Sequence, residues 1–295
     1  MKHTLFTGAG VAIITPMRAD GSVNLDKLRE IINWQIENGT DAIIICGTTG
    51  ESAALSHEEH LETIRAAVEY TAHRIPVIAG SGSNDTAYAA ALSQDAESLG
   101  ADGLLMVTPY YNKTSQAGLV AHFTYVADRV NIPIILYNVP SRTGLSFRPE
   151  TYAALSAHPN ICGIKEASGD FKAIAQTMAL CGDQIDLYSG NDENIIPVLS
   201  LGGVGVISVL SNVFPRAAHN ICAQWLSGDL VSARKLQLDL MPLIDALFCD
   251  VSPIPVKEAM NMMGLDVGPC RLPLVPLSEK NRETLRARLA EQKLL

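Results

Sequence analysis

The sequence predicts an α/β protein built as a closed (β/α)8 barrel, a TIM barrel, with a C-terminal helical appendage. Short β-branched apolar runs alternate with longer amphipathic stretches, which is the pattern of parallel strands joined by helices. Eight such runs occur, at first about every thirty residues and then faster toward the C-terminus, and eight such units match a closed barrel. An open doubly wound sheet is the structural alternative.

The predicted strands are short, rich in β-branched or apolar residues, and bounded by turn residues. Because helices separate them, neighbouring strands are expected to pair in parallel. They cover Val11–Thr15, Ala42–Cys46, Pro76–Ala79, Gly103–Val107, Ile134–Tyr137, Ile161–Lys165, Asp186–Ser189 and Val204–Ser208.

Amphipathic stretches between the first strands predict helices. Leu25–Asn38 has apolar residues at helical spacing and is closed by Gly39, which suits a helix end. His57–Ala72 is preceded by Ser56, and Glu59 follows three residues later. This spacing predicts a capping box, in which each of the two side chains bonds the other residue's backbone N–H.

The C-terminal part of the chain has no strand pattern after a helix expected over Pro215–Ser227. The proline-rich segment 268–276, GPCRLPLVP, cannot be continuous helix and is expected to cross the barrel surface in extended form. We therefore divide the chain into a barrel, residues 1–227, and a C-terminal helical region, residues 228–295. The helices predicted in that region cover Leu230–Phe248, Pro255–Met263 and Ser278–Gln292.

Composition and charge limit the class of protein. Of 295 residues, 47% are apolar and 18% charged, which is typical of a soluble globular chain and excludes a disordered one. The net charge of −9 disfavours nucleic acid or an anionic membrane as the main partner. The start, MKHTLFTGAG, lacks the apolar stretch of a secretory signal, and no run approaches the roughly 18 apolar residues of a membrane span. We expect a cytoplasmic protein.

The cysteines and histidines do not predict a metal site. The six cysteines are scattered in apolar contexts without CxxC spacing, so free thiols are expected rather than disulfides or zinc ligands. The segment HEEH, His57 to His60, is one residue short of the zinc-protease spacing. We interpret it as a pair of histidines on a helix surface.

One lysine ends an apolar strand. In a TIM barrel the active site lies at the carboxyl ends of the strands, and Lys165 follows the apolar residues Ile161–Ile164. A buried ammonium is costly unless it is paired or loses its proton. Its pKa is therefore expected to fall, leaving a free amine that can attack a carbonyl and form a Schiff base. The alternative is an ordinary ion pair with Glu166.

Polar residues also follow the neighbouring strands. Tyr137 ends the adjacent strand, where its phenol can move protons at Lys165, although a merely packed tyrosine is the alternative. Thr48 and Thr49 lie in a glycine-flanked turn whose hydroxyls and N–H groups can hold a carboxylate. Arg142 comes after the tyrosine strand, where a guanidinium can bind a second carboxylate through two hydrogen bonds unless it is only an exposed loop residue.

Four segments contain these residues and their neighbours: GTTGE at 47–51, TPYYN at 108–112, YNVPSRTG at 137–144 and GIKEASGD at 163–170. Together, in order and spacing across nearly the whole chain, they resemble the dihydrodipicolinate synthase family. The lysine, the tyrosine and GTTGE also occur in the wider superfamily of class I pyruvate lyases. Arg142 in SRTG resembles the synthase branch and not N-acetylneuraminate lyase or keto-sugar-acid aldolases. A pyruvate-dependent aldolase of a sugar acid is the alternative enzyme, and a silent barrel that senses a small acid is a third interpretation.

The resemblance implies a lyase that condenses pyruvate with L-aspartate 4-semialdehyde to 4-hydroxy-tetrahydrodipicolinate, the first committed step of diaminopimelate and lysine biosynthesis. It implies no cofactor, because a covalent imine at Lys165 carries the chemistry. Tyr137, Thr48 and, from a neighbouring subunit, Tyr111 would relay protons. Substrate binding would fall to Thr49, Arg142, Gly190 and Ile207.

The resemblance also implies a homotetramer built as a dimer of dimers, with no nucleic-acid or membrane partner, and a cleft between subunits for lysine as an effector. Lysine-sensitive relatives usually carry a glutamate where this chain has Tyr88. A neutral phenol cannot replace a carboxylate beside an ammonium group, so weak or absent inhibition by lysine is expected. The positions that match the cleft are Ser52, Ala53, His57, His60, Asn84, Tyr88 and Tyr110.

Overall fold

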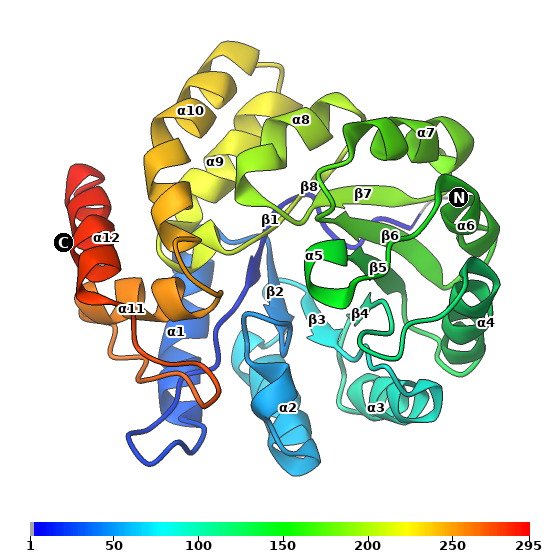
Figure 1. The fold of residues 1–295 in the computed structure, drawn as a ribbon, viewed down its shortest axis with the longest axis horizontal. Helices are drawn as coiled ribbons and strands as arrows, with labels where there is room; N and C mark the ends of the chain where they lie inside the picture. The colour runs from blue at the N-terminus through cyan, green and yellow to red at the C-terminus, as the bar shows by residue number, and fades with distance from the viewer. Residues whose placement is uncertain (1–2) are drawn as a thin grey trace.

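The computed structural model describes residues 3–295, and in it eight parallel strands close into a barrel with helices around it (Figure 1). The strands follow one another around the barrel in chain order, and the first pairs with both the second and the eighth. The TIM barrel is confirmed and the open sheet is excluded. The strands are β1 (Gly8–Ala12), β2 (Ala42–Ile45), β3 (Val77–Gly80), β4 (Gly103–Val107), β5 (Ile134–Asn138), β6 (Ile161–Glu166), β7 (Asp186–Ser189) and β8 (Gly205–Ser208).

The first strand lies three residues earlier than the sequence predicts, while the other strand ends agree with the prediction to within one residue. Gly8 has a φ of +101°, which suits glycine and few other residues. A Cβ on Gly10 would lie 2.5 Å from Ile44 Cδ1, so only glycine lets β1 approach β2 this closely. The glycines are therefore part of the strand and do not precede it.

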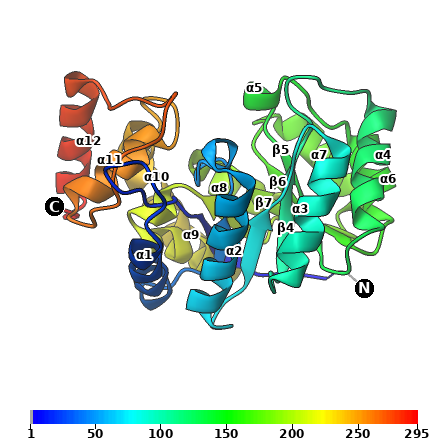
Figure 2. The same ribbon diagram turned by 90° about the horizontal axis from the view of Figure 1, so that it is seen from below.

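Helices connect the strands on the outside of the barrel (Figures 1 and 2). The predicted capping box forms: the Ser56 side chain accepts the Glu59 N–H, and the Glu59 side chain accepts the Ser56 N–H. The helices are α1 (Leu25–Glu37), α2 (His57–Thr71), α3 (Thr86–Ser98), α4 (Gln116–Ala127), α5 (Pro140–Thr143), α6 (Pro149–Ser156), α7 (Phe171–Cys181), α8 (Ile195–Ser200) and α9 (Pro215–Leu226), with the 3-10 turns η1 (Ser52–Ala54), η2 (Asp192–Asn194) and η3 (Leu210–Asn212).

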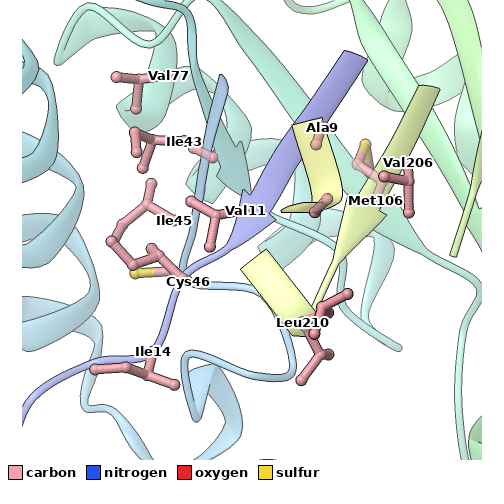
Figure 3. Packing of buried hydrophobic residues seen from close by; sticks show 14 of the residues in the cluster. Ala9, Val11, Ile14, Ile43, Ile45, Cys46, Val77, Met106, Val206 and Leu210 are labelled. Carbon is pink, nitrogen blue, oxygen red and sulfur yellow. The ribbon is translucent and has the colours of Figure 1, made fainter. Parts of the chain in front are cut away.

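Each strand buries both of its faces, which explains why the strand sequences are apolar throughout. In β2, Ile43 and Ile45 pack in the layer between strands and helices, together with Val11 and Val77 (Figure 3). The alternate residue Ile44 belongs to a second cluster that fills the barrel interior and includes Tyr137, Tyr188 and Ile207. Any polar side chain that points into the barrel is therefore surrounded by apolar groups.

The C-terminal region is helical, as predicted, and its helices pack beside α9 and α1 (Figures 1 and 2). Residues 263–278 form neither helix nor strand, so GPCRLPLVP is not continuous helix, as expected. It is not extended throughout, because the chain turns at Leu272 and Pro273, where the Leu274 N–H bonds the Arg271 carbonyl at 3.0 Å. The treatment of residues 228–295 as a separate unit stays a prediction. Among the helices of residues 3–295, none is both long enough and apolar enough to cross a bilayer. The helices are α10 (Leu230–Leu247), α11 (Ile254–Met262) and α12 (Glu279–Glu291).

Candidate active site

Lys165 and Tyr137 face each other inside the barrel, near the carboxyl ends of β6 and β5. The strand pairing places the two residues opposite each other, and Lys165 Nζ lies 4.2 Å from the centre of the Tyr137 ring. Lys165 is only 6% exposed. The structure therefore brings together the lysine and the tyrosine that the sequence singled out.

An irregularity in β6 sets this alignment. Ile134 pairs with Ile161 but Ile135 pairs with Gly163, so Cys162 is an extra residue in β6 and the register shifts there. Because side chains alternate along a strand, a slip of one residue would move Lys165 from the barrel interior to the helix layer. The bulge thus determines that the lysine points into the barrel.

Burial adjusts the proton affinities of both residues. Burial lowers the pKa of Lys165 from 10.5 to about 7; the charge of Asp192 opposes this change and that of Arg142 adds to it. Burial also raises the pKa of Tyr137 to about 12. At neutral pH roughly half of the lysine is a free amine while the phenol keeps its proton. This is the combination needed for attack on a carbonyl beside a proton donor.

Glu166 is not the ion-pair partner of Lys165, so that alternative is wrong. Its carboxylate accepts hydrogen bonds from both Asn138 Nδ2 (3.0 and 3.1 Å) and Tyr152 OH (3.1 Å). The Ser168 N–H donates a further bond of 2.8 Å. Asn138 and Glu166 are themselves register partners, directly after the Tyr137 and Lys165 pair. Their side chains therefore tie β5 to β6 at the level of the site.

Asp192 is a charged residue of this site that the sequence analysis missed. It follows β7 in the segment SGND, and it is 1% exposed. Its Oδ2 accepts the backbone N–H groups of Val209 (3.0 Å) and Leu210 (2.8 Å), just after β8. Burial raises its pKa to about 6 against the effect of these bonds. The only sequence feature that could have indicated it is its position directly after a predicted barrel strand. Its hydrogen bonds to residues after β8 could not be predicted from the sequence.

Arg142 lies in α5, a single helical turn, and not in the loop expected from the sequence. Its side chain is exposed, and its Nη2 donates to the Ser252 carbonyl of the C-terminal region at 3.4 Å. Its positive charge lowers the pKa of both Tyr137 and Lys165. The guanidinium therefore acts electrostatically on both Lys165 and Tyr137.

The turn that carries Thr48 and Thr49 folds tightly after β2. Gly50 N–H bonds the Gly47 carbonyl (3.1 Å), and Glu51 N–H bonds the Thr48 carbonyl (3.0 Å). Thr49 is buried and Thr48 is exposed. Within residues 3–295 of the single chain, no hydrogen bond joins a hydroxyl of this turn to Tyr137. The expected proton relay is therefore not formed in one chain alone.

The remaining predicted site residues lie at three different positions. Gly190 follows β7, and its N–H donates to the Glu166 carbonyl at 2.8 Å. Ile207 lies on β8 in the same interior cluster as Tyr137. Tyr111, in contrast, is 91% exposed, with a φ of +68°, and projects from the chain after β4. Gly190 and Ile207 thus border the site, whereas Tyr111 does not contribute to it within one chain.

Several predicted effector residues gather between α2 and α3. His57 Nδ1 lies 3.3 Å from Tyr88 OH, and the two rings pack edge to face. Burial, with a contribution from Tyr110, raises the pKa of Tyr88 above its ordinary value, so the phenol is uncharged at neutral pH. Asn84 lies at the start of α3, and its carbonyl accepts a bond from Asn112. Position 88 itself carries no carboxylate, but Asp95 lies at the cluster, with its Oδ2 3.9 Å from His57 Nε2.

The interpretation of HEEH as two surface histidines is wrong for His60. His57 is exposed, but His60 is buried, and its Nε2 lies 2.8 Å from the Gly80 carbonyl. His60 belongs to the buried face of α2 together with Thr63, Ile64 and Ala67, whereas His57, the first residue of the helix, is exposed. Within residues 3–295, no three His, Cys, Asp or Glu side chains are grouped closely enough to hold a metal ion. The six cysteines are all free thiols, as predicted.

Comparison with known proteins agrees with this geometry. The dihydrodipicolinate synthetase family matches residues 5–292. The 4-hydroxy-tetrahydrodipicolinate synthase of Thermoanaerobacter sp. (strain X514) is 55% identical over 292 residues, which are 99% of this chain and 98% of that protein.

Solved structures of dihydrodipicolinate synthases resemble this chain in fold along its whole length. Dihydrodipicolinate synthase from Thermotoga maritima has a TM-score of 0.97 and 43% identity, and the match covers 99% of this chain and 100% of that one. The chloride-inhibited dihydrodipicolinate synthase from Acinetobacter baumannii, solved in complex with pyruvate, has a TM-score of 0.96 and 42% identity over 99% of this chain and 100% of that one.

Proposed function

The chain belongs to the dihydrodipicolinate synthetase family, and we propose that it condenses pyruvate with L-aspartate 4-semialdehyde through an imine at Lys165. It is an enzyme of the 4-hydroxy-tetrahydrodipicolinate synthase type, a lyase of diaminopimelate and lysine biosynthesis. The observation that carries the proposal is the buried amine of Lys165, which has a pKa of about 7 and lies against the Tyr137 ring.

In this proposal the covalent steps take place on the amine of Lys165 and use no cofactor. The free amine of Lys165 attacks the keto carbon of pyruvate, and the carbinolamine loses water to give a protonated imine. The imine nitrogen then accepts the electron pair released when the methyl group loses a proton. The resulting enamine attacks the aldehyde carbon and forms the new carbon–carbon bond. The amino group of the second substrate finally displaces the lysine, which closes the ring and restores the free amine.

The other residues bind and transfer protons. Tyr137 protonates the leaving hydroxyl of the carbinolamine, because it holds its proton at neutral pH beside the amine. Thr49 and its turn bind the pyruvate carboxylate, with Gly190 and Ile207 on the opposite side of the site. Arg142 binds the carboxylate of the aldehyde through a charge-assisted pair.

Tyr111 supports an assembly of more than one chain. A tyrosine that is 91% exposed at a positive φ exposes a large ring to solvent, and a neighbouring subunit would bury it. We assign it to the neighbouring active site, where it completes the relay from Thr48, within a homotetramer built as a dimer of dimers. A cytoplasmic location likewise stays a prediction.

Borohydride reduction in the presence of pyruvate tests the central step. The adduct should map by mass spectrometry to the peptide that contains Lys165, and Lys165→Ala should abolish labelling. Lys257 is the matched internal control: it is also buried, but its ammonium donates to three oxygens and has no free electron pair. An adduct on Lys257, or none at all, would refute the mechanism.

The alternative enzyme, a pyruvate-dependent aldolase of sugar acids, is disfavoured by Arg142. A fixed positive charge at the position of the second substrate suits a short aldehyde with a carboxylate, and a polyhydroxylated chain does not need it. The two functions are distinguished by assaying pyruvate release from a keto-sugar acid next to pyruvate consumption with aspartate semialdehyde. Faster turnover of the sugar acid would favour the alternative.

A further inference from the structure

A buried ion pair connects the C-terminal region to the turn that carries Thr48 and Thr49. Glu51, the last residue of GTTGE, accepts a 2.8 Å bond from Nζ of Lys257 in α11. The two side chains are 1% and 2% exposed, and the residues are 206 positions apart in the chain. No part of the catalytic scheme above uses either of them.

Every polar atom of this pair has a partner. The Lys257 ammonium also donates to the carbonyl oxygens of Thr15 (3.1 Å) and Pro269 (2.6 Å), so its three protons are all bonded. The second oxygen of Glu51 accepts the N–H of Arg271 at 2.8 Å. The pair thus joins four segments: the chain after β1, the turn after β2, helix α11 and the irregular segment 263–278.

The backbone of the turn needs this support. Glu51 has a φ of +56°, a left-handed conformation that a glycine adopts freely and that is strained for a glutamate. A glutamate at such a position indicates that its side-chain bonds offset the strain. Thr15 adds a second support, since its hydroxyl donates to the Gly50 carbonyl at 2.7 Å and its own carbonyl accepts from Lys257.

A buried ion pair does not by itself stabilise a protein, because desolvation of both charges offsets their attraction. What it does provide is a fixed geometry, because neither charge can move without losing its partner. Here the fixed element is the turn that carries Thr49, which follows the carboxyl end of β2 and so lies at the same end of the barrel as Lys165, near the end of β6. We infer that Glu51 and Lys257 are positioning residues for the first substrate: they hold Thr49 and the N–H groups of its turn in the orientation that receives the pyruvate carboxylate.

This inference rests on the proposed function, since it depends on pyruvate being the molecule held at the turn. It gives the C-terminal region a part in the reaction that its sequence did not predict. It also separates the two substrates. The pair touches the turn of Thr49 after β2, whereas Arg142, assigned to the aldehyde, lies in α5 after β5, three strands further around the barrel. Loss of the pair should therefore impair one substrate and not the other.

The test compares Glu51→Gln, Lys257→Met and the double variant by steady-state kinetics and by pyruvate trapping with borohydride. Each single variant leaves one buried charge unpaired and should raise the KM for pyruvate roughly ten- to a hundredfold. The KM for the aldehyde should stay within about twofold of the original value. The double variant leaves no unpaired charge and should recover part of the loss of either single variant.

Glu258→Gln is the matched control. Glu258 is adjacent to Lys257 in α11 and also forms an ion pair, a 2.7 Å contact with Arg282, but this pair does not touch the turn. Its kinetics should match those of the unchanged protein. If the single variants do not fold, the double variant tests the inference instead. A raised KM for pyruvate in the double variant supports the inference, and an unchanged KM for pyruvate refutes it. Equal losses for both substrates in folded variants also refute it. Failure of the unchanged protein to trap pyruvate would instead refute the proposed function.

Discussion

Replacing Lys165 by methionine should destroy activity but stabilise the fold. Methionine is close to lysine in shape and has no charge, so the substitution removes the cost of placing an ammonium among apolar groups. Catalytic residues in unfavourable environments often show this exchange of stability for activity. Lys165 is a clear case, because the fall in its pKa measures the energetic cost of burying its charge.

The lowered pKa of Lys165 gives the size and the sign of the expected change in the free energy of unfolding. The difference between a pKa of 10.5 and one of about 7 corresponds to about 5 kcal/mol. For a basic group whose pKa falls on folding, this cost is present in full below about pH 7, where lysine is charged in both states. It is relieved between pH 7 and 10.5, where only the unfolded chain holds the proton. The advantage of Lys165→Met should be largest at or below pH 7 and fall to roughly 2 kcal/mol at pH 9.

Thermal unfolding of both proteins, at one protein concentration and at several pH values from 6 to 9, measures this effect. The unfolding temperature of Lys165→Met should exceed that of the unchanged protein most at low pH. Lys280→Met is the control, since Lys280 is exposed on α12, and its effect should be small and independent of pH. Equal stability at pH 6.5, or an advantage that grows with pH, would show that the buried amine is not deprotonated by its surroundings.

Three further predictions concern the substrates and the assembly. Arg142→Ala should raise the KM for the aldehyde by roughly ten- to a hundredfold, because about 1.5–3 kcal/mol of binding free energy is lost with the charge-assisted pair. Borohydride trapping of pyruvate should persist. Loss of trapping in a folded protein would assign Arg142 to pyruvate. Mixing inactive Tyr111→Phe and Lys165→Ala chains under subunit exchange should restore part of the activity, and inactive hybrids of demonstrated composition would contradict a shared site. Lysine should inhibit weakly, and Tyr88→Glu should strengthen inhibition by one to two decades in affinity, whereas potent inhibition of the unchanged protein would show that a neutral phenol suffices.

The strand order of this fold was accessible from the sequence because a parallel barrel repeats one pattern eight times. The position of β1 was not, because Gly8 and Gly10 read as a break before a strand. Glycine has two opposite uses: it weakens a strand in isolation, and it permits close approach when another backbone is near. Only the neighbouring strand decides between them, and it is more than thirty residues away.

The site residues also divide into those that could be predicted from the sequence and those that could not. Lys165 and Tyr137 were predictable, since each ends an apolar run and strand ends meet at one edge of a barrel. Asp192 and Lys257 were not, because their roles depend on partners distant in sequence: backbone N–H groups after β8 for one, and a turn 206 residues earlier for the other. A charged residue in an apolar context signals that a partner exists, but it does not identify the partner.

The charges around Lys165 act in an order that suits the proposed reaction. Burial lowers the pKa of Lys165 most and so leaves the amine partly free to attack pyruvate, while Asp192 favours a positive charge on the nitrogen and Arg142 disfavours it. When the carboxylate of the aldehyde pairs with Arg142, it offsets the positive charge of the guanidinium. The effect of Asp192 then prevails at the stage where the enamine attacks the aldehyde and positive charge returns to the nitrogen. Binding of the second substrate would thus supply the electrostatic change that the second chemical step requires.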